Sequence, residues 1–293
     1  MSAISAITVA LNMLVITSVS HFRRLHTPTN LLLLSLAVSD FNVGLMVFPG
    51  KIITTTSCWF LGDFTCSLYK YITCLTVSAS VGNMVMISAD RYAAICDPLH
   101  YPNRITAARI KLCICLCWLF SGVYSSYIVY VDSMLNVKYP PCYGECLIAV
   151  NYITAVIDLV LVFVAPVTII IVLYMAVFLV AVSQARAMRS HITSINHHHH
   201  SGTLTSRKSE LKAARTLGIL VVVFLTCYCP HYCAALIRED SPTTLLFLVC
   251  LILLNSCMNP VIYALFYPWF RKAVKHIVTL QILQPGSREA NIL

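Results

Sequence analysis

The amino-acid sequence predicts an all-α membrane protein, a seven-transmembrane helix bundle with a short amphipathic C-terminal helix. Composition is the first observation: 59% of the 293 residues are hydrophobic and 11% are charged, whereas roughly a quarter of a soluble domain is charged. The second is a series of seven apolar segments, each able to cross about 30 Å of hydrocarbon at about 1.5 Å per helical residue. The third is positive charge that alternates from loop to loop.

The boundaries of the spans follow from the apolar runs. In chain order we place them at Met1–Ser20, Asn30–Phe48, Ser67–Ile95, Leu112–Val131, Tyr152–Ser183, Lys212–Ile237 and Thr244–Phe266. We expect residues 1–293 to form a single receptor-sized domain with no N-terminal tail before the first span. Residues 184–211 are then the third cytoplasmic loop, and residues 281–293 are the cytoplasmic tail.

The location of the net charge of +9 sets the orientation. Alternate loops and the tail hold Arg23, Arg24, Arg104, Arg109, Lys111, Arg186, Arg189, Arg207, Lys208, Lys212, Arg215, Arg271, Lys272, Lys275 and Arg288. The other loops are assigned only Lys51, Lys70, Lys138 and Arg238. Because Lys and Arg favour cytoplasmic loops, we expect a multi-pass protein of the plasma membrane with an extracellular N-terminus. The same distribution argues against nucleic acid as a partner.

After the last span, residues 267–280 are predicted to form the amphipathic helix. Trp269 and Phe270 supply an apolar side, and Arg271, Lys272 and Lys275 supply charge that suits anionic headgroups. Membrane lipids are therefore expected partners of this helix.

Polar residues inside the spans carry the functional signal, because an ionisable group there costs roughly 2.5–3.5 kcal/mol. Asp40 and Asp158 lie within spans, and Asp90-Arg91-Tyr92 closes the third. Alone, Asp90 and Arg91 would also suit an interfacial charge pair. The other span residues that count here are Asn12, Trp118, Pro166 with Tyr174, Pro230, and Asn259-Pro260 with Tyr263. Together these residues resemble a rhodopsin-like, class A G-protein-coupled receptor.

The resemblance narrows at the seventh span. Residues 255–270 match the pattern N-S-x-x-N-P-x-x-Y-x-x-x-Y-x-W-F, which is typical of the trace amine-associated receptors. Similarity covers nearly the whole chain. It is strongest to fish-type receptors of a divergent subgroup that lacks the acidic residue of the third helix.

This resemblance implies a G-protein switch at the cytoplasmic side. Arg91 would pair with Asp90, beside Tyr92, and with Glu210 at the foot of the sixth helix. Release of Arg91 would admit a heterotrimeric G protein of the stimulatory, olfactory type. The resemblance also implies that Tyr174 and Tyr263 meet in the active state, next to Asn259 and Pro260 of the seventh span.

A cluster in the middle of the bundle resembles the family's sodium pocket. Its members are Asp40, Ser80, Asn255, Ser256 and Asn259. Oxygen ligands with one carboxylate suit a hard cation, so Na⁺ is the one cofactor the resemblance suggests. A hydrated polar cluster without sodium is the alternative.

The family's amine anchor is replaced in this chain. Relatives carry an Asp seventeen residues before Asp90, where this sequence has Thr73. The resemblance assigns the anchor instead to Asp158, the only carboxylate we place in the outer cavity; a structural hydrogen bond to a neighbouring helix is the alternative for it. Other predicted cavity residues are Cys74, Val77, Ser78, Tyr228, His231 and Tyr232. Tyr228 stands where the family usually has Trp, and His231 and Tyr232 also suit simple packing.

The family resemblance also implies a pairing for the cysteines near the extracellular loops. By resemblance, Cys146 of the second extracellular loop would pair with Cys66 at the start of the third helix. The family's partner for Cys142 lies in an N-terminal tail, so Cys142 is expected to be free or to pair outside that pattern, with Cys58 as a substitute.

The leading hypothesis is an olfactory-type receptor for a small-molecule amine, with the ammonium held by Asp158 and coupling to a stimulatory G protein and cAMP. The alternatives are a non-signalling or truncated receptor remnant and a seven-helix transporter or retinal-binding pump. The seventh span contains no Lys for a Schiff base, which disfavours a pump. Neither an HExxH motif nor a P-loop occurs, so an enzyme is not expected.

Overall fold

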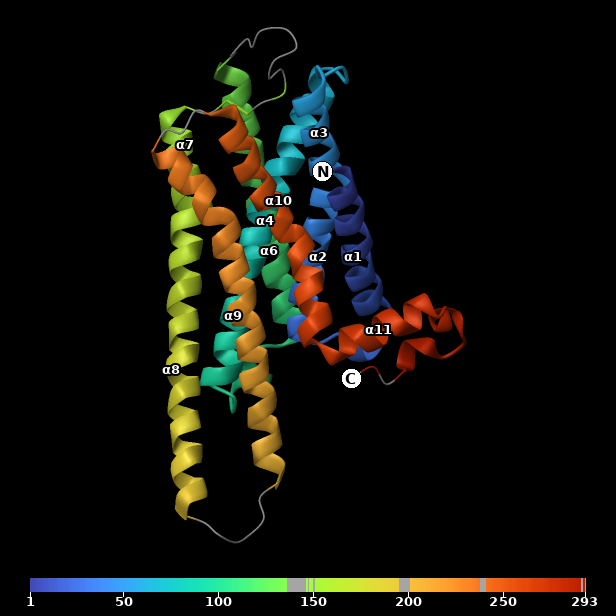
Figure 1. The fold of residues 1–293 in the computed structure, drawn as a ribbon, viewed down its shortest axis with the longest axis vertical. Coiled ribbons are helices and arrows are strands. Elements are labelled where there is room, and N and C mark those ends of the chain that lie inside the picture. The colour runs from blue at the N-terminus through green and yellow to red at the C-terminus, as the bar shows by residue number, and fades with distance from the viewer. Residues whose placement is uncertain are drawn as a thin grey trace.

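The computed structural model describes residues 1–135, 146, 148–149, 151–194, 201–237, 241–290 and 292. Its side-chain description leaves out 181, 184–194, 201–217 and 242. Figure 1 shows long helices running side by side, with one short helix lying across an end of the bundle. The predicted fold class is confirmed.

Seven helical segments of the described chain are long and apolar enough to cross a membrane. They are built from α1 (Ser2–His21), α2 (Pro28–Asn42) with α3 (Phe48–Thr56), α4 (Asp63–Cys96), α6 (Ala107–Leu135), α7 (Tyr152–Asp158) with α8 (Ala165–Ser194), α9 (Ser201–Leu236) and α10 (Pro242–Phe266). Thr27 caps α2 by accepting a hydrogen bond from the backbone N–H of Asn30 at 3.3 Å, and Pro28 provides the fixed φ that suits a first helical turn.

Two spans contain a widened π-helical turn. Val43–Val47 joins α2 to α3, and Leu159–Val164 joins α7 to α8. A proline follows each turn, Pro49 in α3 and Pro166 in α8. Proline cannot donate a backbone hydrogen bond to the preceding turn, so that turn widens instead of breaking the helix. The second widened turn begins directly after Asp158, which closes α7.

Several boundaries differ from those expected from hydropathy. The second span continues through α3 to Thr56 instead of ending at Phe48. The expected third loop, 184–211, is helical on both sides, since α8 runs to Ser194 and α9 begins at Ser201. Hydropathy marks where the hydrocarbon ends, but residues with adequate helix propensity continue the helix beyond it. The C-terminal helix α11 is Pro268–Val278, within the predicted 267–280.

The core is narrow and much of the apolar surface faces outward. One main cluster of buried apolar side chains joins α1, α2, α4, α9 and α10, including Leu36, Met84, Phe224 and Tyr263. The span Tyr152–Val180 is the most hydropathic, yet little of it is buried. An apolar surface of this size that no protein covers suits lipid.

Small residues allow the helices to approach closely. A Cβ added to Gly50 of α3 would lie 2.2 Å from ring atom Cε2 of Tyr69 in α4, and one added to Gly82 of α4 would lie 2.5 Å from Sγ of Cys117 in α6. Van der Waals packing at such contacts drives helix association in lipid, where burial of apolar surface contributes little.

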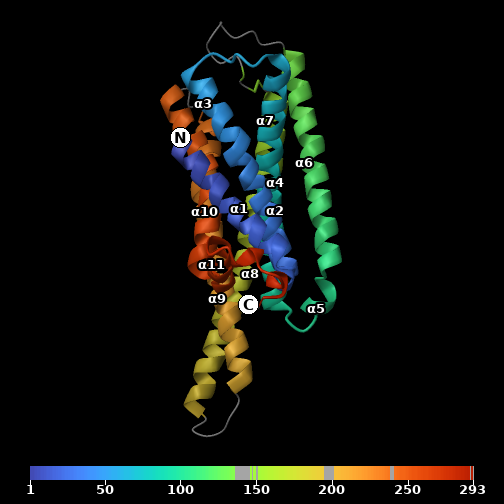
Figure 2. The ribbon, with the colours of Figure 1, turned by 90° about the vertical axis from the view of Figure 1, so that its right-hand side faces the viewer.

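One end of the bundle, here called the basic end, carries η1 (Arg23–Leu25), α5 (Tyr101–Arg104) and α11 (Figure 2). Arg271 of α11 donates to the carbonyls of Ala264 at 3.1 Å and Leu265 at 3.0 Å, which caps the last turn of α10. The C-terminal segment returns to α1 through a 3.0 Å hydrogen bond between His21 and Ser287.

Gly50→Ala is predicted to lower the thermal stability of the protein purified in detergent. The new methyl group would overlap the Tyr69 ring, and such overpacking typically costs about 1–3 kcal/mol. Thr55→Ala, at an exposed position of the same helix, is the control and should unfold at the parent temperature. Equal melting temperatures for Gly50→Ala and the parent would contradict this packing.

Candidate functional site

Asp158 is the central group of the first polar site, toward the end of the bundle opposite the basic end. It is half-buried. Its Oδ1 accepts a hydrogen bond from the hydroxyl of Tyr124 in α6, and its Oδ2 accepts one from Tyr232 in α9 at 3.3 Å. The carboxylate therefore points toward neighbouring helices rather than toward lipid, and its two oxygens are oriented by donors from two of them.

Aromatic side chains surround this carboxylate. The rings of Phe163 and Tyr232 stack with centroids 4.4 Å apart, and His231 packs edge-on against Tyr232 at 5.3 Å. Nδ1 of His231 is buried and has no hydrogen-bond partner among the described residues. Tyr228 is buried and lies against Phe224 at 4.5 Å. An anion with aromatic faces beside it is an arrangement that attracts a cation.

The predicted residues of α4 line one side of the bundle interior. The hydroxyl of Thr73 donates a 2.8 Å hydrogen bond to the carbonyl of Tyr69 in its own helix. Threonine has no charge to offer a ligand. Ser78 is buried and donates to the carbonyl of Leu75 at 3.3 Å. Cys74 and Val77 are half-buried and pack against the main apolar cluster.

Three polar residues near Asp158 were not predicted for the cavity. One is Tyr124, and the other two form a buried ion pair, in which Nζ of Lys70 lies 2.7 Å from Oδ2 of Asp132. Lys70 belongs to helix α4 and not to a loop, and Asp132 belongs to α6. Asp132 is therefore a second carboxylate toward this end of the bundle, paired with Lys70, and the expectation that Asp158 is the only carboxylate of the outer cavity stays a prediction. In the sequence, Lys70 lies one turn after Cys66 and Asp132 lies at the end of the fourth span. Charged residues at such positions are the signal that could have predicted the pair.

A disulfide covers the same end of the bundle. Cys66 at the start of α4 is bonded to Cys146, with Cα atoms 5.6 Å apart, as the resemblance implied. Cys58 is also disulfide-bonded. Cys142 lies outside the described residues, so its expected state stays a prediction.

The second polar site lies in the middle of the bundle around Asp40, which is fully buried. Nδ2 of Asn259 donates to Oδ2 of Asp40 at 2.8 Å. The hydroxyl of Ser80 lies 3.5 Å from Oδ1 of Asp40 and 2.9 Å from the hydroxyl of Ser39. Three helices, α2, α4 and α10, therefore meet at one carboxylate.

Several buried polar atoms on α1, α4 and α10 have no protein partner among the described residues. They include both amide atoms of Asn83 and of Asn255, Oδ1 of Asn12 and of Asn259, and the hydroxyl of Tyr263. Ser256 is buried beside them, and its carbonyl accepts a 3.0 Å hydrogen bond from Asn12. Orphaned oxygens around one buried carboxylate fit a hard cation or ordered water.

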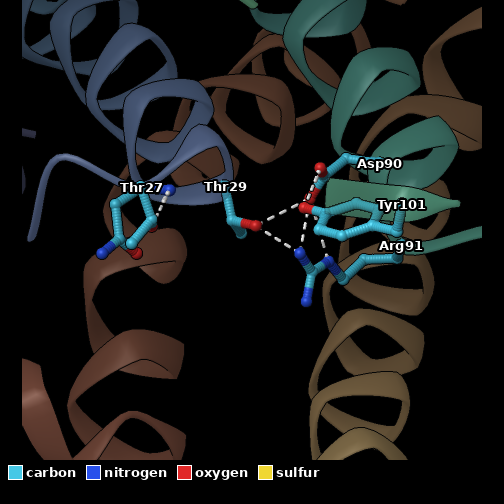
Figure 3. A network of polar contacts seen from close by, with 6 residues as sticks. Thr27, Thr29, Asp90, Arg91 and Tyr101 are labelled. Carbon is cyan, nitrogen blue, oxygen red and sulfur yellow. Dashed lines mark hydrogen bonds and ion pairs between the residues drawn. The ribbon is translucent and has the colours of Figure 1, made fainter. Parts of the chain in front are cut away.

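The third polar site is the Asp90–Arg91 pair at the basic end (Figure 3). Oδ2 of Asp90 lies 2.6 Å from Nη2 of Arg91 and accepts a hydrogen bond from Thr29 of α2 at 2.8 Å. Oδ1 of Asp90 accepts one from Tyr101 of α5 at 2.8 Å. Burial raises the pKa of the Tyr101 phenol above its usual range, so this hydroxyl keeps the proton it donates. Tyr92 is exposed.

Thr29 and Tyr101 were not predicted members of this network. Both approach Asp90 from other elements, so the network ties α2, α4 and α5 together. The side chain of Glu210, the expected second partner of Arg91, lies outside the described residues. Its contact with Arg91 stays a prediction.

The two tyrosines of the expected switch lie in different surroundings. Tyr174 packs against Gly218 of α9, where an added Cβ would lie 2.2 Å from its Oη. The two residues line a cavity of about 310 Å³ with Ile219, Val222 and Val223. Tyr263 is fully buried beside Asn259 and Pro260, and its hydroxyl is unpaired among the described residues. The structure does not join the two hydroxyls.

Comparisons with known proteins agree with this architecture. Residues 11–263 match the family described as 7 transmembrane receptor (rhodopsin family). Trace amine-associated receptor 13c of Danio rerio is 36% identical, over 98% of this chain and 86% of that receptor. Trace amine-associated receptors 7a and 7f of Mus musculus are 38% and 39% identical, over 98% and 96% of this chain and 83% and 81% of their own lengths.

Proposed function

Because the chain belongs to the trace amine-associated receptors of the rhodopsin family, we propose that it binds a small amine whose ammonium group pairs with Asp158. The single observation that carries this proposal is the orientation of that carboxylate. Its oxygens are held toward the bundle by Tyr124 and Tyr232, while Thr73 supplies no charge on α4.

The chemistry of the site favours a cation. Two neutral hydroxyl donors orient Asp158 but leave it one full negative charge, and each carboxylate oxygen retains acceptor capacity for an ammonium N–H. Phe163 and Tyr232 offer apolar and aromatic surface to the rest of the ligand. A partly desolvated ammonium–carboxylate contact is stronger than the same contact in water.

The proposed orientation puts the Asp158 end outside the cell. The basic end then faces the cytoplasm, where α5, α11 and the Asp90–Arg91 network are accessible to a heterotrimeric G protein. Arg91 suits the switch because it stays charged and offers several donors that pass from a carboxylate to other acceptors. We assign the stimulatory type of G protein, cAMP as the output and the plasma membrane as the location.

Asp158→Asn is predicted to raise the amine concentration for half-maximal cAMP output. The variant keeps the shape of the side chain and removes the charge, and truncating a partly buried charge pair costs roughly a hundredfold or more in affinity. The probes are 2-phenylethylamine, trimethylamine and 1,5-diaminopentane, applied at matched surface expression. Asp63→Asn, at an exposed position of α4, is the control for loss of one carboxylate. A response to amines equal to that of the parent would make Asp158 structural.

Tyr101→Phe is predicted to raise cAMP output in the absence of an amine. It removes one donor from Asp90, so the Asp90–Arg91 arrangement is less favoured, by roughly fivefold in population for one hydrogen bond. Tyr130→Phe, at an exposed position of α6, should change nothing. Arg91→Ala should abolish cAMP output both in the parent and in the Tyr101→Phe variant. A cAMP signal that persists in a surface-expressed Arg91→Ala protein would refute the role of Arg91 in G-protein activation.

We further propose that the Asp40 cluster binds Na⁺ through Asp40, Ser80, Asn255, Ser256 and Asn259. The unpaired buried oxygens support this assignment. Sodium bound to the folded receptor alone would add about 1.4 kcal/mol of stability at ten times its dissociation constant.

The sodium proposal predicts a higher melting temperature in NaCl than in KCl at equal ionic strength. Asp40→Asn should remove that difference, because the variant loses the one negative charge of the cluster. The control is Ser125→Ala, which removes a buried hydroxyl bonded within its own helix. This variant should keep the difference in melting temperature between NaCl and KCl. Equal melting temperatures of the parent protein in the two salts would contradict sodium binding and favour a hydrated polar cluster without sodium.

A further inference from the structure

The Lys70–Asp132 ion pair is a buried charged contact that the proposed ligand site does not use. The side chains are 11% and 12% exposed, and the two atoms are 2.7 Å apart. Burying two ions costs several kcal/mol each before their attraction is counted, and ionisable groups inside membrane spans are rare. Apolar side chains would join α4 and α6 at lower cost. The second carboxylate oxygen of Asp132 shows a further role for this ion pair.

That second oxygen accepts a backbone hydrogen bond from beyond α6. Oδ1 of Asp132 lies 2.7 Å from the backbone nitrogen of Ala149. Ala149 stands two residues before Asn151, whose side chain caps α7 by accepting from the N–H of Thr154 at 2.8 Å. The carboxylate therefore connects α4, α6 and the entry to α7.

The entry to α7 leads directly to the proposed anchor. α7 is a short helix, Tyr152–Asp158, and its last residue carries the anchoring carboxylate. The widened turn after it separates α7 from the long helix α8, so the position of α7 depends on what holds its first residues. Cys146, bonded to Cys66 one turn before Lys70, holds the chain three residues ahead of Ala149.

α6 contacts the chain just before α7 and again at the last residue of α7. Asp132 accepts a hydrogen bond from the backbone N–H of Ala149, three residues before α7 begins, and Tyr124 donates to Asp158 at the end of α7. Residues 124 and 132 are eight positions apart in one helix, so they lie about 80° apart around the helix and about 12 Å apart along its axis. Between the two contacts the chain runs from Ala149, three residues before α7, to Asp158 at its end.

We propose that Lys70 and Asp132 are positioning residues for the amine anchor. Lys70 fixes the rotamer of Asp132, Asp132 takes the N–H of Ala149, and α7 is thereby set at the height where Asp158 meets Tyr124 and Tyr232. This inference rests on the proposed role of Asp158 in amine binding.

A pair of double variants separates this role from simple attraction between α4 and α6. Lys70→Asp with Asp132→Lys keeps an ion pair but removes the acceptor for Ala149, because an ammonium cannot accept a hydrogen bond. Lys70→Gln with Asp132→Asn removes both charges and keeps an acceptor oxygen at position 132. Exchanging the exposed pair, Arg23→Glu with Glu289→Arg, is the control.

Two readouts are measured on the full-length receptor. Hydrogen exchange of amides in residues 148–158 follows the entry to α7 without any amine. The half-maximal concentration of 2-phenylethylamine and 1,5-diaminopentane in the cAMP assay, at matched surface expression, follows the anchor.

The charge exchange should accelerate hydrogen exchange in that segment. It should also raise the half-maximal amine concentration roughly tenfold, the loss expected for one unmade buried hydrogen bond, with the maximal output unchanged. The neutral pair should match the parent in both readouts. In an Asp158→Asn background the charge exchange should cause no further loss of potency, because the anchor it positions is gone.

Other results overturn the proposal. If the Lys70→Asp, Asp132→Lys variant has the amide hydrogen-exchange rates and the amine potency of the parent, Ala149 needs no acceptor. Equal losses in both double variants would assign the role to the ion pair alone. If the charge-exchange variant does not reach the surface, Lys70→Met with Asp132→Leu replaces it, since it also lacks the acceptor. Failure of the proposed function is seen separately, as unchanged potency in Asp158→Asn alone.

Discussion

A carboxylate inside a membrane-spanning bundle must find hydrogen-bond donors or cations within the protein, because hydrocarbon supplies none. In the described part of this chain that constraint ties the helices together. Asp40 joins α2, α4 and α10, and Asp90 joins α2, α4 and α5. Asp132 joins α4, α6 and the entry to α7, and Asp158 joins α7, α6 and α9. Apolar packing fills the space between these contacts.

The sequence predicted the number of spans, the fold class and the Cys66–Cys146 bond because those features depend on local composition or on residue-by-residue resemblance. It did not predict Tyr124, Tyr101 or the partnership of Lys70 with Asp132. Each of these depends on the rotation of one helix against another, and that rotation is set by side-chain packing across the bundle rather than by hydropathy. Around Tyr124 the buried face carries Ser121 and Ser125 while Val123 is exposed, so apolar periodicity does not distinguish the buried face.

Prolines explain part of what hydropathy misses. Pro49 and Pro166 each follow a widened turn, and such a turn rotates the preceding segment relative to the following one. A regular helix through residues 152–194 would point Asp158 in a different direction relative to α8. The proline of α8 therefore contributes to the site although it makes no contact with the carboxylate, and a pattern based on 3.6 residues per turn fails across it.

α9 connects the Asp158 site to the packing against α8 farther along the bundle. Tyr232 bonds Asp158 near one end, and Gly218 receives the ring of Tyr174 fourteen residues away, about 21 Å along the helix. Pro230 lies between them and interrupts the backbone hydrogen bonds there. In the proposed binding mode an ammonium at Asp158 lies beside Tyr232, whose hydroxyl bonds the same carboxylate, so it would act on α9 just beyond that proline. Because Tyr174 fits only where Gly218 lacks a side chain, a small shift of the inner half of α9 separates the two residues. In the proposed function, occupation of Asp158 would therefore be linked to the packing of α8 on α9 through one helix that is weakened at Pro230.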